Sequence, residues 1–163
     1  KINNDMNIIK ESNDASKFIK DYKNKKYVDL NSFNKTQITE AIAKKYNICS
    51  VADIKGYLYT DKNNSFVALV AVGTYKDKKS WIQPIEVAKK YRGRGLSKQL
   101  IDIAVNELGA KYLGVFIDNK VAIYIYKKYG FKVFKIVSDG TAYFMTIDPK
   151  QKIDKKYNNI NLV

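Results

Sequence analysis

Residues 92–97, Arg92-Gly93-Arg94-Gly95-Leu96-Ser97, decide how the rest of this chain is interpreted. They follow a strand-like stretch that ends near Val87, and they run into apolar residues at helical spacing from about Leu96 to Leu108. Two glycines at such a junction allow a tight turn whose backbone N–H groups point outward at the positive end of the helix. The turn therefore predicts a site for an anion such as a pyrophosphate.

The two arginines of this turn are the only arginines in the chain. The other 28 of the 30 basic residues are lysine, so a chain that uses lysine elsewhere places both guanidinium groups here. Arginine forms charge-assisted, bidentate hydrogen bonds with phosphate oxygens, which favours the anion site. The alternative is a turn whose glycines serve packing only.

The net charge of +14 raises the question of nucleic-acid binding. The lysines are spread along the sequence rather than gathered in one stripe, so we favour a solvated lysine surface and keep nucleic-acid binding as a less favoured alternative. No apolar run approaches the roughly 20 residues that a membrane span needs, so no membrane is expected. Oligomeric state is left open between monomer and homodimer.

Histidine is absent and Cys49 is the single cysteine. This composition excludes Ser-His and Cys-His nucleophile pairs, an internal disulfide and the commonest zinc ligand, and we predict no metal site. A single thiol fits a reducing compartment, so a cytoplasmic location is expected. Cys49 lies in an apolar stretch and is interpreted as a packed thiol.

The hydrophobic pattern predicts one α/β (α+β) domain over residues 1–148 and a polar tail over 149–163 to which no structure is assigned. The sheet should be mixed, mostly antiparallel and of about seven strands, with helices on both faces. The expected strands are Met6–Glu11, Ser50–Tyr59, Ser65–Tyr75, Ser80–Ala88, Tyr112–Ile117, Phe131–Val137 and Thr141–Ile147. The expected helices are Ala15–Tyr22, one capped by Asn34 or Thr36, Leu96–Leu108, and one from Asn119 to Gly130.

Two blocks of sequence together resemble the GNAT superfamily of N-acetyltransferases. The pattern Gln/Arg-x-x-Gly-x-Gly/Ala is matched by Arg92-x-x-Gly95-x-Ser97, with serine as a departure at the last position. The second block, residues 119–131, resembles Asn-x-x-Ala-x-x-x-Tyr-x-x-x-Gly-Phe. The resemblance extends over about residues 6–147 and implies the GNAT fold.

The resemblance implies acetyl-CoA as cofactor and an amine as its partner. The implied cofactor-binding residues are Ile85, Val87, Arg92, Gly93, Arg94, Gly95, Leu96, Ser97 and Asn119. Backbone groups of Ile85 and Val87 would hold the pantetheine arm, and the Val87 N–H would polarise the thioester carbonyl.

The implied catalytic residues are Tyr126 and Glu86. Tyr126 would protonate the departing thiolate because the pKa of a phenol lies close to that of a thiol. Packing among neighbouring aromatics is the alternative interpretation of Tyr126. Glu86 is one of two candidates for the base, and Asp118 is the weaker one. The position where some protein N-terminal acetyltransferases carry a glutamate is Gly114 here, which weakens that subtype.

The predicted function is therefore transfer of an acetyl group to a primary amine by direct attack in a ternary complex. The acceptor could be a small molecule, a peptide or a protein. Two alternatives stay open: a GNAT-fold module that binds acyl-CoA without turnover, and an acetyltransferase acting on an RNA-linked amine such as aminoacyl-tRNA.

Overall fold

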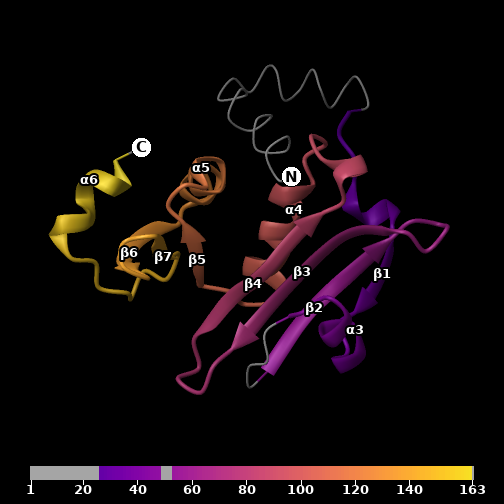
Figure 1. Cartoon of the computed structure of the whole chain (residues 1–163), viewed down its shortest axis with the longest axis horizontal. Coiled ribbons are helices and arrows are strands. Elements are labelled where there is room, and N and C mark those ends of the chain that lie inside the picture. The colour runs from indigo at the N-terminus through magenta and orange to yellow at the C-terminus, as the bar shows by residue number, and fades with distance from the viewer. Residues whose placement is uncertain (1–25, 49–52, 163) are drawn as a thin grey trace.

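Seven strands form one mixed sheet in the order β1-β2-β3-β4-β5-β7-β6 (Figure 1). The computed structural model describes residues 26–48 and 53–162. The strands are β1 (Asn34–Gln37), β2 (Asp53–Thr60), β3 (Phe66–Thr74), β4 (Ser80–Val87), β5 (Tyr112–Phe116), β6 (Lys132–Val137) and β7 (Ala142–Thr146). Only β4 and β5 run parallel, and every other neighbouring pair is antiparallel. The predicted sheet is confirmed.

Helices cover both faces of this sheet. They are α3 (Glu40–Lys45), α4 (Leu96–Asp102), α5 (Lys120–Tyr129) and α6 (Asn158–Asn161), and α4 continues as a π-helical segment over Ile103–Glu107. Short 3-10 helices occupy Leu30–Ser32, Lys89–Tyr91 and Lys155–Tyr157.

The central strand β3 is buried on both faces, so its side chains divide between two hydrophobic clusters. Ala68, Val70 and Val72 belong to the main core together with α4 and α5, whereas Leu69 and Ala71 face α3. Such a strand reads as a continuous apolar run rather than as an alternating one. The main core continues under β5, β6 and β7, where α5 packs.

The N-terminal half differs from the sequence-based expectation. Asn34 and Thr36 do not cap a helix; both lie in β1, and Thr39 caps α3 by accepting a hydrogen bond from the Ile42 N–H. All four residues of β1 are exposed and polar, so this edge strand has no apolar alternation to detect. The expected strand Met6–Glu11, the expected helix Ala15–Tyr22 and Cys49 lie outside the described residues.

Residues 149–162, to which the sequence assigned no structure, are folded against the sheet edge. Tyr157 is buried in the main core, and the side chain of Asn161 is hydrogen bonded to both backbone groups of Val133 on β6. The Asn161 oxygen accepts from the Val133 N–H at 2.8 Å, and its amide donates to the Val133 carbonyl at 3.1 Å. A side chain thus takes the place of a neighbouring strand at this position of the outer edge.

Candidate active site

Strands β4 and β5 meet at one position and then separate (Figure 1). Within these two fully described strands, the register pairs Trp81 with Tyr112 and no later residues. A bulge in β4 accompanies the separation, because Ile82 and Ile85 pair with Val72 and Val70, which are only two residues apart on β3. The result is a gap in the middle of the sheet, bordered by the second halves of β4 and β5.

The backbone of β4 presents groups to this gap that no strand of the described residues pairs with. Ala88 donates its N–H to the Val67 carbonyl at 2.8 Å, and hydrogen-bonded and non-hydrogen-bonded pairs alternate along an antiparallel ladder. Val87 and Ile85, which lie opposite Ala68 and Val70, therefore turn their N–H and C=O groups away from β3. Those groups face the side on which β5 has moved away.

The turn after β4 has the backbone that its glycines allow. Gly93 and Gly95 adopt φ values of 76° and 82°, in the left-handed region that glycine tolerates best. Arg92 folds back, and its Nε donates to the Val87 carbonyl at 3.0 Å. The side chains of Leu96 and Ser97 are buried, so the part of these residues that can reach a ligand is their backbone at the start of α4.

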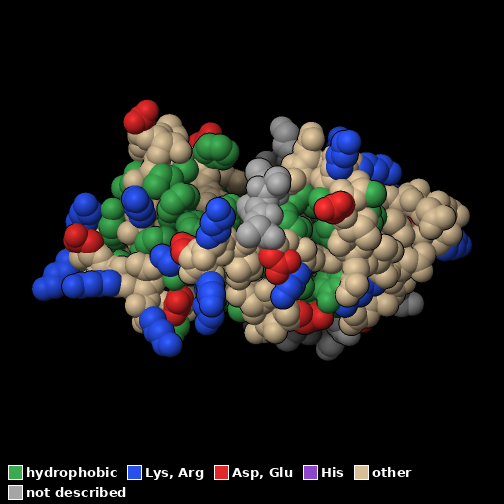
Figure 2. Space-filling model, turned by 90° about the horizontal axis from the view of Figure 1, so that it is seen from below, with side chains coloured by type: hydrophobic (Ala, Val, Ile, Leu, Met, Phe, Trp, Pro, Cys, Tyr) green, Lys and Arg blue, Asp and Glu red, His purple; other side chains and the backbone are tan. Residues whose placement is uncertain are grey.

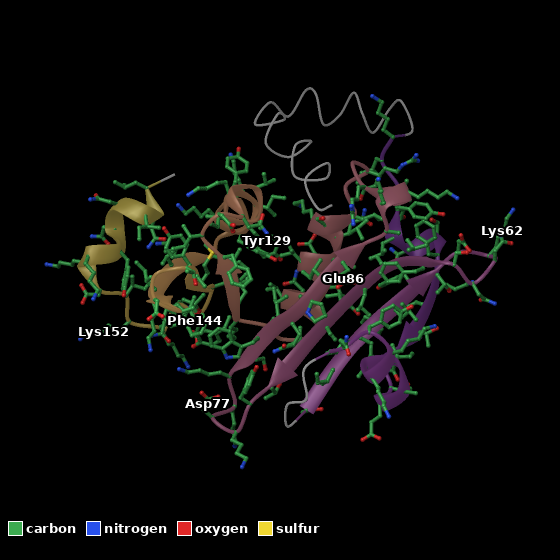
Figure 3. All side chains as sticks on the ribbon, in the orientation of Figure 1. Lys62, Asp77, Glu86, Tyr129, Phe144 and Lys152 are labelled. Carbon is green, nitrogen blue, oxygen red and sulfur yellow. The ribbon has the colours of Figure 1, made fainter. Side chains whose placement is uncertain are left out.

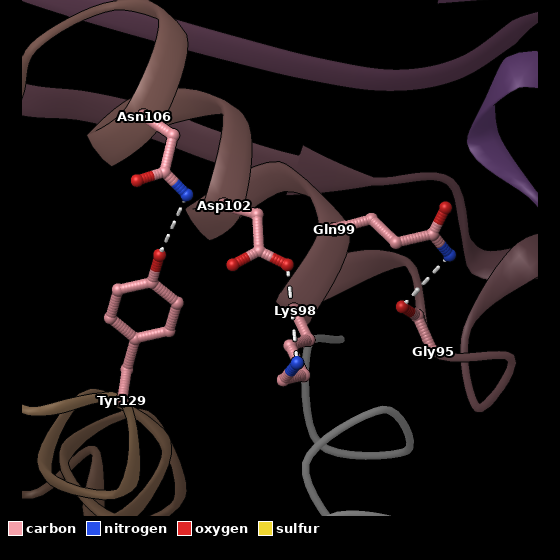
Figure 4. Close-up of polar contacts among 6 residues, drawn as sticks. All are labelled: Gly95, Lys98, Gln99, Asp102, Asn106 and Tyr129. Carbon is pink, nitrogen blue, oxygen red and sulfur yellow. Dashed lines mark hydrogen bonds and ion pairs between the residues drawn. The ribbon is translucent and has the colours of Figure 1, made fainter.

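Gln99 fixes this turn to the N-terminal segment. Its Oε1 accepts from the Leu30 N–H at 2.8 Å, and its Nε2 donates to the Val28 carbonyl at 2.8 Å. The same Nε2 donates to the Gly95 carbonyl at 3.1 Å (Figure 4). A Cβ added at Gly95 would lie 3.0 Å from the Tyr27 ring, so the segment also packs closely on the turn. Gln99 could not be identified from the sequence, because one glutamine on a helix carries no distinguishing pattern.

Asn119 begins α5 as predicted. Its Oδ1 accepts from the Ala122 N–H at 3.2 Å, and Gly130 ends the helix with φ 124°. The Oδ1 atom of Asn119 is therefore occupied by the helix cap, and the amide nitrogen is the part of its side chain that the cap does not use.

Tyr126 lies on α5, packed against the main core and edge-to-face with Phe131 at 5.9 Å between ring centroids. Its hydroxyl makes no hydrogen bond with any of residues 26–48 or 53–162. Burial raises the pKa of Tyr126 to about 12, so the phenol stays protonated at neutral pH.

Tyr129, one turn further along α5, reaches the helix on the other side of the gap. Its hydroxyl accepts from Asn106 Nδ2 at 3.5 Å, in the π-helical segment that extends α4 (Figure 4). Burial, followed by the proximity of Asp102, raises the pKa of Tyr129 to about 12. This contact connects the helix after β4 with the helix after β5.

Glu86 lies on the opposite face of the sheet from Tyr126. It pairs with Leu69, whose side chain faces α3, whereas α5 packs with the main core on the other face. Figure 3 places Glu86 on the part of β4 that has separated from β5. Its side chain is exposed, as is that of Asp118. The two predicted catalytic groups therefore approach the gap from different faces.

Among the described residues, no helix has the length and apolarity that crossing a membrane requires.

Comparisons with known proteins show which family and fold this chain resembles. The model of the acetyltransferase (GNAT) family matches residues 20–131. A search of curated proteins gives no match.

Solved structures share the fold. A GNAT-family acetyltransferase from Elizabethkingia anophelis, solved with acetyl-CoA bound, gives a TM-score of 0.53 at 19% identity, covering 72% of this chain and 98% of that one. Nourseothricin acetyltransferase gives a TM-score of 0.53 at 18% identity, covering 71% of this chain and 98% of that one. Ard1 from Thermoplasma volcanium gives a TM-score of 0.52 at 22% identity, covering 70% of this chain and 95% of that one.

These identities show a common fold and no more, whereas the family model covers more than half of the sequence and both motif blocks. The chain therefore belongs to the acetyltransferase (GNAT) family, whose members are enzymes that use acetyl-CoA.

Proposed function

We propose that this protein transfers the acetyl group of acetyl-CoA to a primary amine, by direct attack of the amine within a ternary complex. The observation that carries the proposal is the unpaired β4 edge at Ile85 and Val87, beside the gap that β5 leaves. A pantetheine arm has amide groups that can pair with such an edge like an added strand. Acetyl-CoA supplies the activated thioester.

The turn after β4 suits the pyrophosphate of the same molecule. The left-handed glycines at 93 and 95 shape the backbone at the start of α4, and Arg92 and Arg94 add positive charge. We assign Leu96 and Ser97 backbone roles because their side chains are buried. Asn119 is assigned to the cofactor through its amide nitrogen, since its oxygen caps α5.

The Val87 N–H is proposed to stabilise the negative charge that develops on the thioester oxygen. The Val87 N–H belongs to the peptide unit between Glu86 and Val87, and the peptide unit that follows is held by the hydrogen bond from Arg92 to the Val87 carbonyl. A fixed donor needs no reorganisation during the reaction, and that is the source of its effect.

Two side chains are proposed to move the protons. The nitrogen–carbon bond to the acetyl group forms as the carbon–sulfur bond breaks, the amine loses a proton to Glu86, and the thiolate gains one from Tyr126. Burial raises the pKa of Tyr126 to about 12, so its proton is present across the neutral range. The same shift makes the phenol a weaker acid than a thiol, so the matched pKa values expected from the sequence are lost in this state. With no histidine in the chain, a Ser-His or Cys-His nucleophile is excluded, which favours direct attack.

The test measures binding and turnover separately. Calorimetry with acetyl-CoA should show one site that weakens by about tenfold or more in Arg92→Ala, through loss of a charge-assisted contact. Release of free thiol with a panel of primary amines should show turnover. Tight binding with no turnover on any amine would replace the proposal by the non-catalytic module, and no binding would reject both.

A further inference from the structure

An aromatic surface lies beside the gap on the face opposite α5. We call it the aromatic face; it consists of Trp81, Tyr112, Phe116, Phe134 and Phe144, of which Phe116 is exposed, Tyr112 is buried and the others are half-buried. Trp81 stacks on Tyr112 with centroids 5.2 Å apart and meets the Phe144 ring edge-on at 4.7 Å. In the view from below, hydrophobic side chains gather over the half of the sheet that contains β5, β6 and β7 (Figure 2).

Strand alternation places Glu86 and Gly114 on this same face. Trp81 and Glu86 lie opposite Gly73 and Leu69 on β3. Gly73 and Leu69 are four residues apart, which is an even number, so both positions belong to the same face of the sheet. On β5, Gly114 and Phe116 follow Tyr112 at intervals of two residues and share its face. The proposed base on β4 thus borders the same surface as these residues of β5.

Gly114 is exposed in the middle of β5, and its own backbone does not require glycine. Glycine in a strand interior weakens the strand, and it is usually explained by a left-handed φ or by close approach of another backbone. Gly114 has neither: its φ is not positive, and an added Cβ would meet only the Phe144 ring, at 3.5 Å, an ordinary contact. Its effect is to leave the Phe144 ring uncovered at the edge of the gap.

Phe116 adjoins this opening and is 65% exposed. A single exposed apolar side chain is common, but Phe116 follows Gly114 on the same face of β5 and so extends the apolar surface beside the rings. Contiguous exposed apolar surface of this kind is typical of a binding site. Together Gly114 and Phe116 form an open apolar position next to the place where an attacking amine must enter.

The charges around the aromatic face restrict what can bind there. Glu86 provides a negative charge at the gap. The far side carries Lys79, whose Nζ lies 5.3 Å from the centre of the Tyr112 ring, and Lys135, which pairs with Phe144. The carboxylate on that far side, Asp148, already accepts a hydrogen bond from the Tyr112 hydroxyl at 3.2 Å. A ligand with one amine at Glu86 and an apolar body over the rings is complementary to this arrangement. A polyamine would bring further positive charge toward the lysines, in a chain of net charge +14.

We propose that the aromatic face binds the acceptor, and that the acceptor is a monoamine carrying an aromatic or branched apolar group. This inference rests on the proposed function, since it names the acceptor class of the same site. Gly114 and Phe116 are specificity residues: they contact the body of the acceptor and take no part in proton transfer.

Binding can be followed without turnover because Trp81 is the only tryptophan in the chain. Titration of the full-length protein with phenethylamine, in the presence of desulfo-CoA, should change the fluorescence of Trp81 in a saturable manner. Spermidine at equal ionic strength should produce no such saturable change. Saturation by spermidine alone, or by neither amine, would overturn the inference.

Two pairs of variants test the residues. Gly114→Leu should cover the Phe144 ring and raise the KM for phenethylamine by about tenfold or more, while Gly114→Ala, which makes only an ordinary contact, should change it by less than about threefold. Phe116→Ala should raise the same KM, whereas Leu162→Ala, a 72% exposed residue on the C-terminal segment, should not. The KM for acetyl-CoA should stay unchanged in all four.

The outcomes separate the two proposals. If acetyl-CoA binds and some amine is acetylated, but Gly114→Leu and Phe116→Ala affect phenethylamine no more than their controls do, the acceptor assignment fails and the proposed function stands. If no amine releases thiol, the proposed function fails, and with it the inference.

Discussion

Trp81 on β4 and Tyr112 on β5 form the only backbone pairing between the two described strands, and their rings stack at a centroid distance of 5.2 Å. The sheet is therefore joined across its middle at this pair and at the adjacent hydrogen bond from the Lys111 N–H to the Ser80 carbonyl. Beyond them, β5 no longer pairs with β4.

Trp81→Ala should destabilise the protein by about 2–3 kcal/mol, less than for a fully buried tryptophan because Trp81 is half-buried. The substitution removes ring contacts with Tyr112 and Phe144 at the point where the strands meet. Urea unfolding followed by far-UV circular dichroism measures the effect. Trp81→Phe, which retains a ring, should recover much of the loss; a change below about 0.5 kcal/mol in the alanine variant would contradict this role.

Gln99→Ala should cost about 2–3 kcal/mol, because three hydrogen bonds of about 1 kcal/mol each are lost. The Leu30 N–H should also exchange with solvent faster, since its acceptor is the Gln99 side chain. Hydrogen exchange and urea unfolding give the two measurements. Gln37→Ala, on the exposed strand β1, is the matched control and should stay within about 0.5 kcal/mol of the parent.

Tyr126→Phe should lower kcat by about 10²–10⁴-fold while the Kd for acetyl-CoA stays within about threefold, because a general acid acts only in the transition state. Tyr143→Phe, a half-buried tyrosine on β7, serves as control. In the parent enzyme, the pKa of about 12 implies that Tyr126 causes no loss of rate below about pH 11. Equal kcat values for the two phenylalanine variants would remove Tyr126 from the mechanism.

Stability should fall at alkaline pH through two half-buried tyrosines, Tyr126 and Tyr129. The folded-state pKa values of Tyr126 and Tyr129 are raised from 10 to about 12, so their contribution is complete below pH 10 and is lost as pH rises through 12. Urea unfolding at a series of pH values, with tyrosinate absorbance, measures this loss. A double phenylalanine variant at these positions should show a shallower decline; a decline identical to that of the parent would assign the alkaline loss elsewhere.

Asn161→Ala should destabilise the protein by about 1–3 kcal/mol, since two hydrogen bonds to Val133 are removed. Exchange of the Val133 N–H should accelerate at the same time, which distinguishes local release of the β6 edge from a general loss of stability. Asn158→Ala, an exposed position at the start of α6, is the control. No change in Val133 exchange would mean that the edge is protected by other contacts.

The second half of the chain was largely predictable because its signals are local. The glycines at 93, 95 and 130 require or favour left-handed backbone, Asn119 provides a cap, and the apolar stripe of α4 has helical spacing. Each of these can be recognised from a few adjacent residues.

The parts that were missed depend on partners distant in sequence. Strand β1 is entirely exposed and is a strand only because it pairs with β2, and the folded C-terminal segment depends on Asn161 reaching Val133, 28 residues away. Gln99 likewise acts on residues about 70 positions earlier. The candidate site shows the same division: its turn was predicted from the motif, whereas the aromatic face comes from four strands brought together by the topology.

The single pairing of Trp81 with Tyr112 has a mechanical consequence. Strands β1 to β4 and strands β5 to β7 form two parts of the sheet, joined at the start of β4 and β5 by the Trp81–Tyr112 pairing, by the hydrogen bond from the Lys111 N–H to the Ser80 carbonyl and by the ring contacts of Trp81. A molecule bound along β4 would contact both parts of the sheet, so its binding energy would also oppose their separation. Ligand binding and the free energy of unfolding are then linked: a ligand concentration of about 100 times Kd would add about 2.7 kcal/mol to the free energy of unfolding.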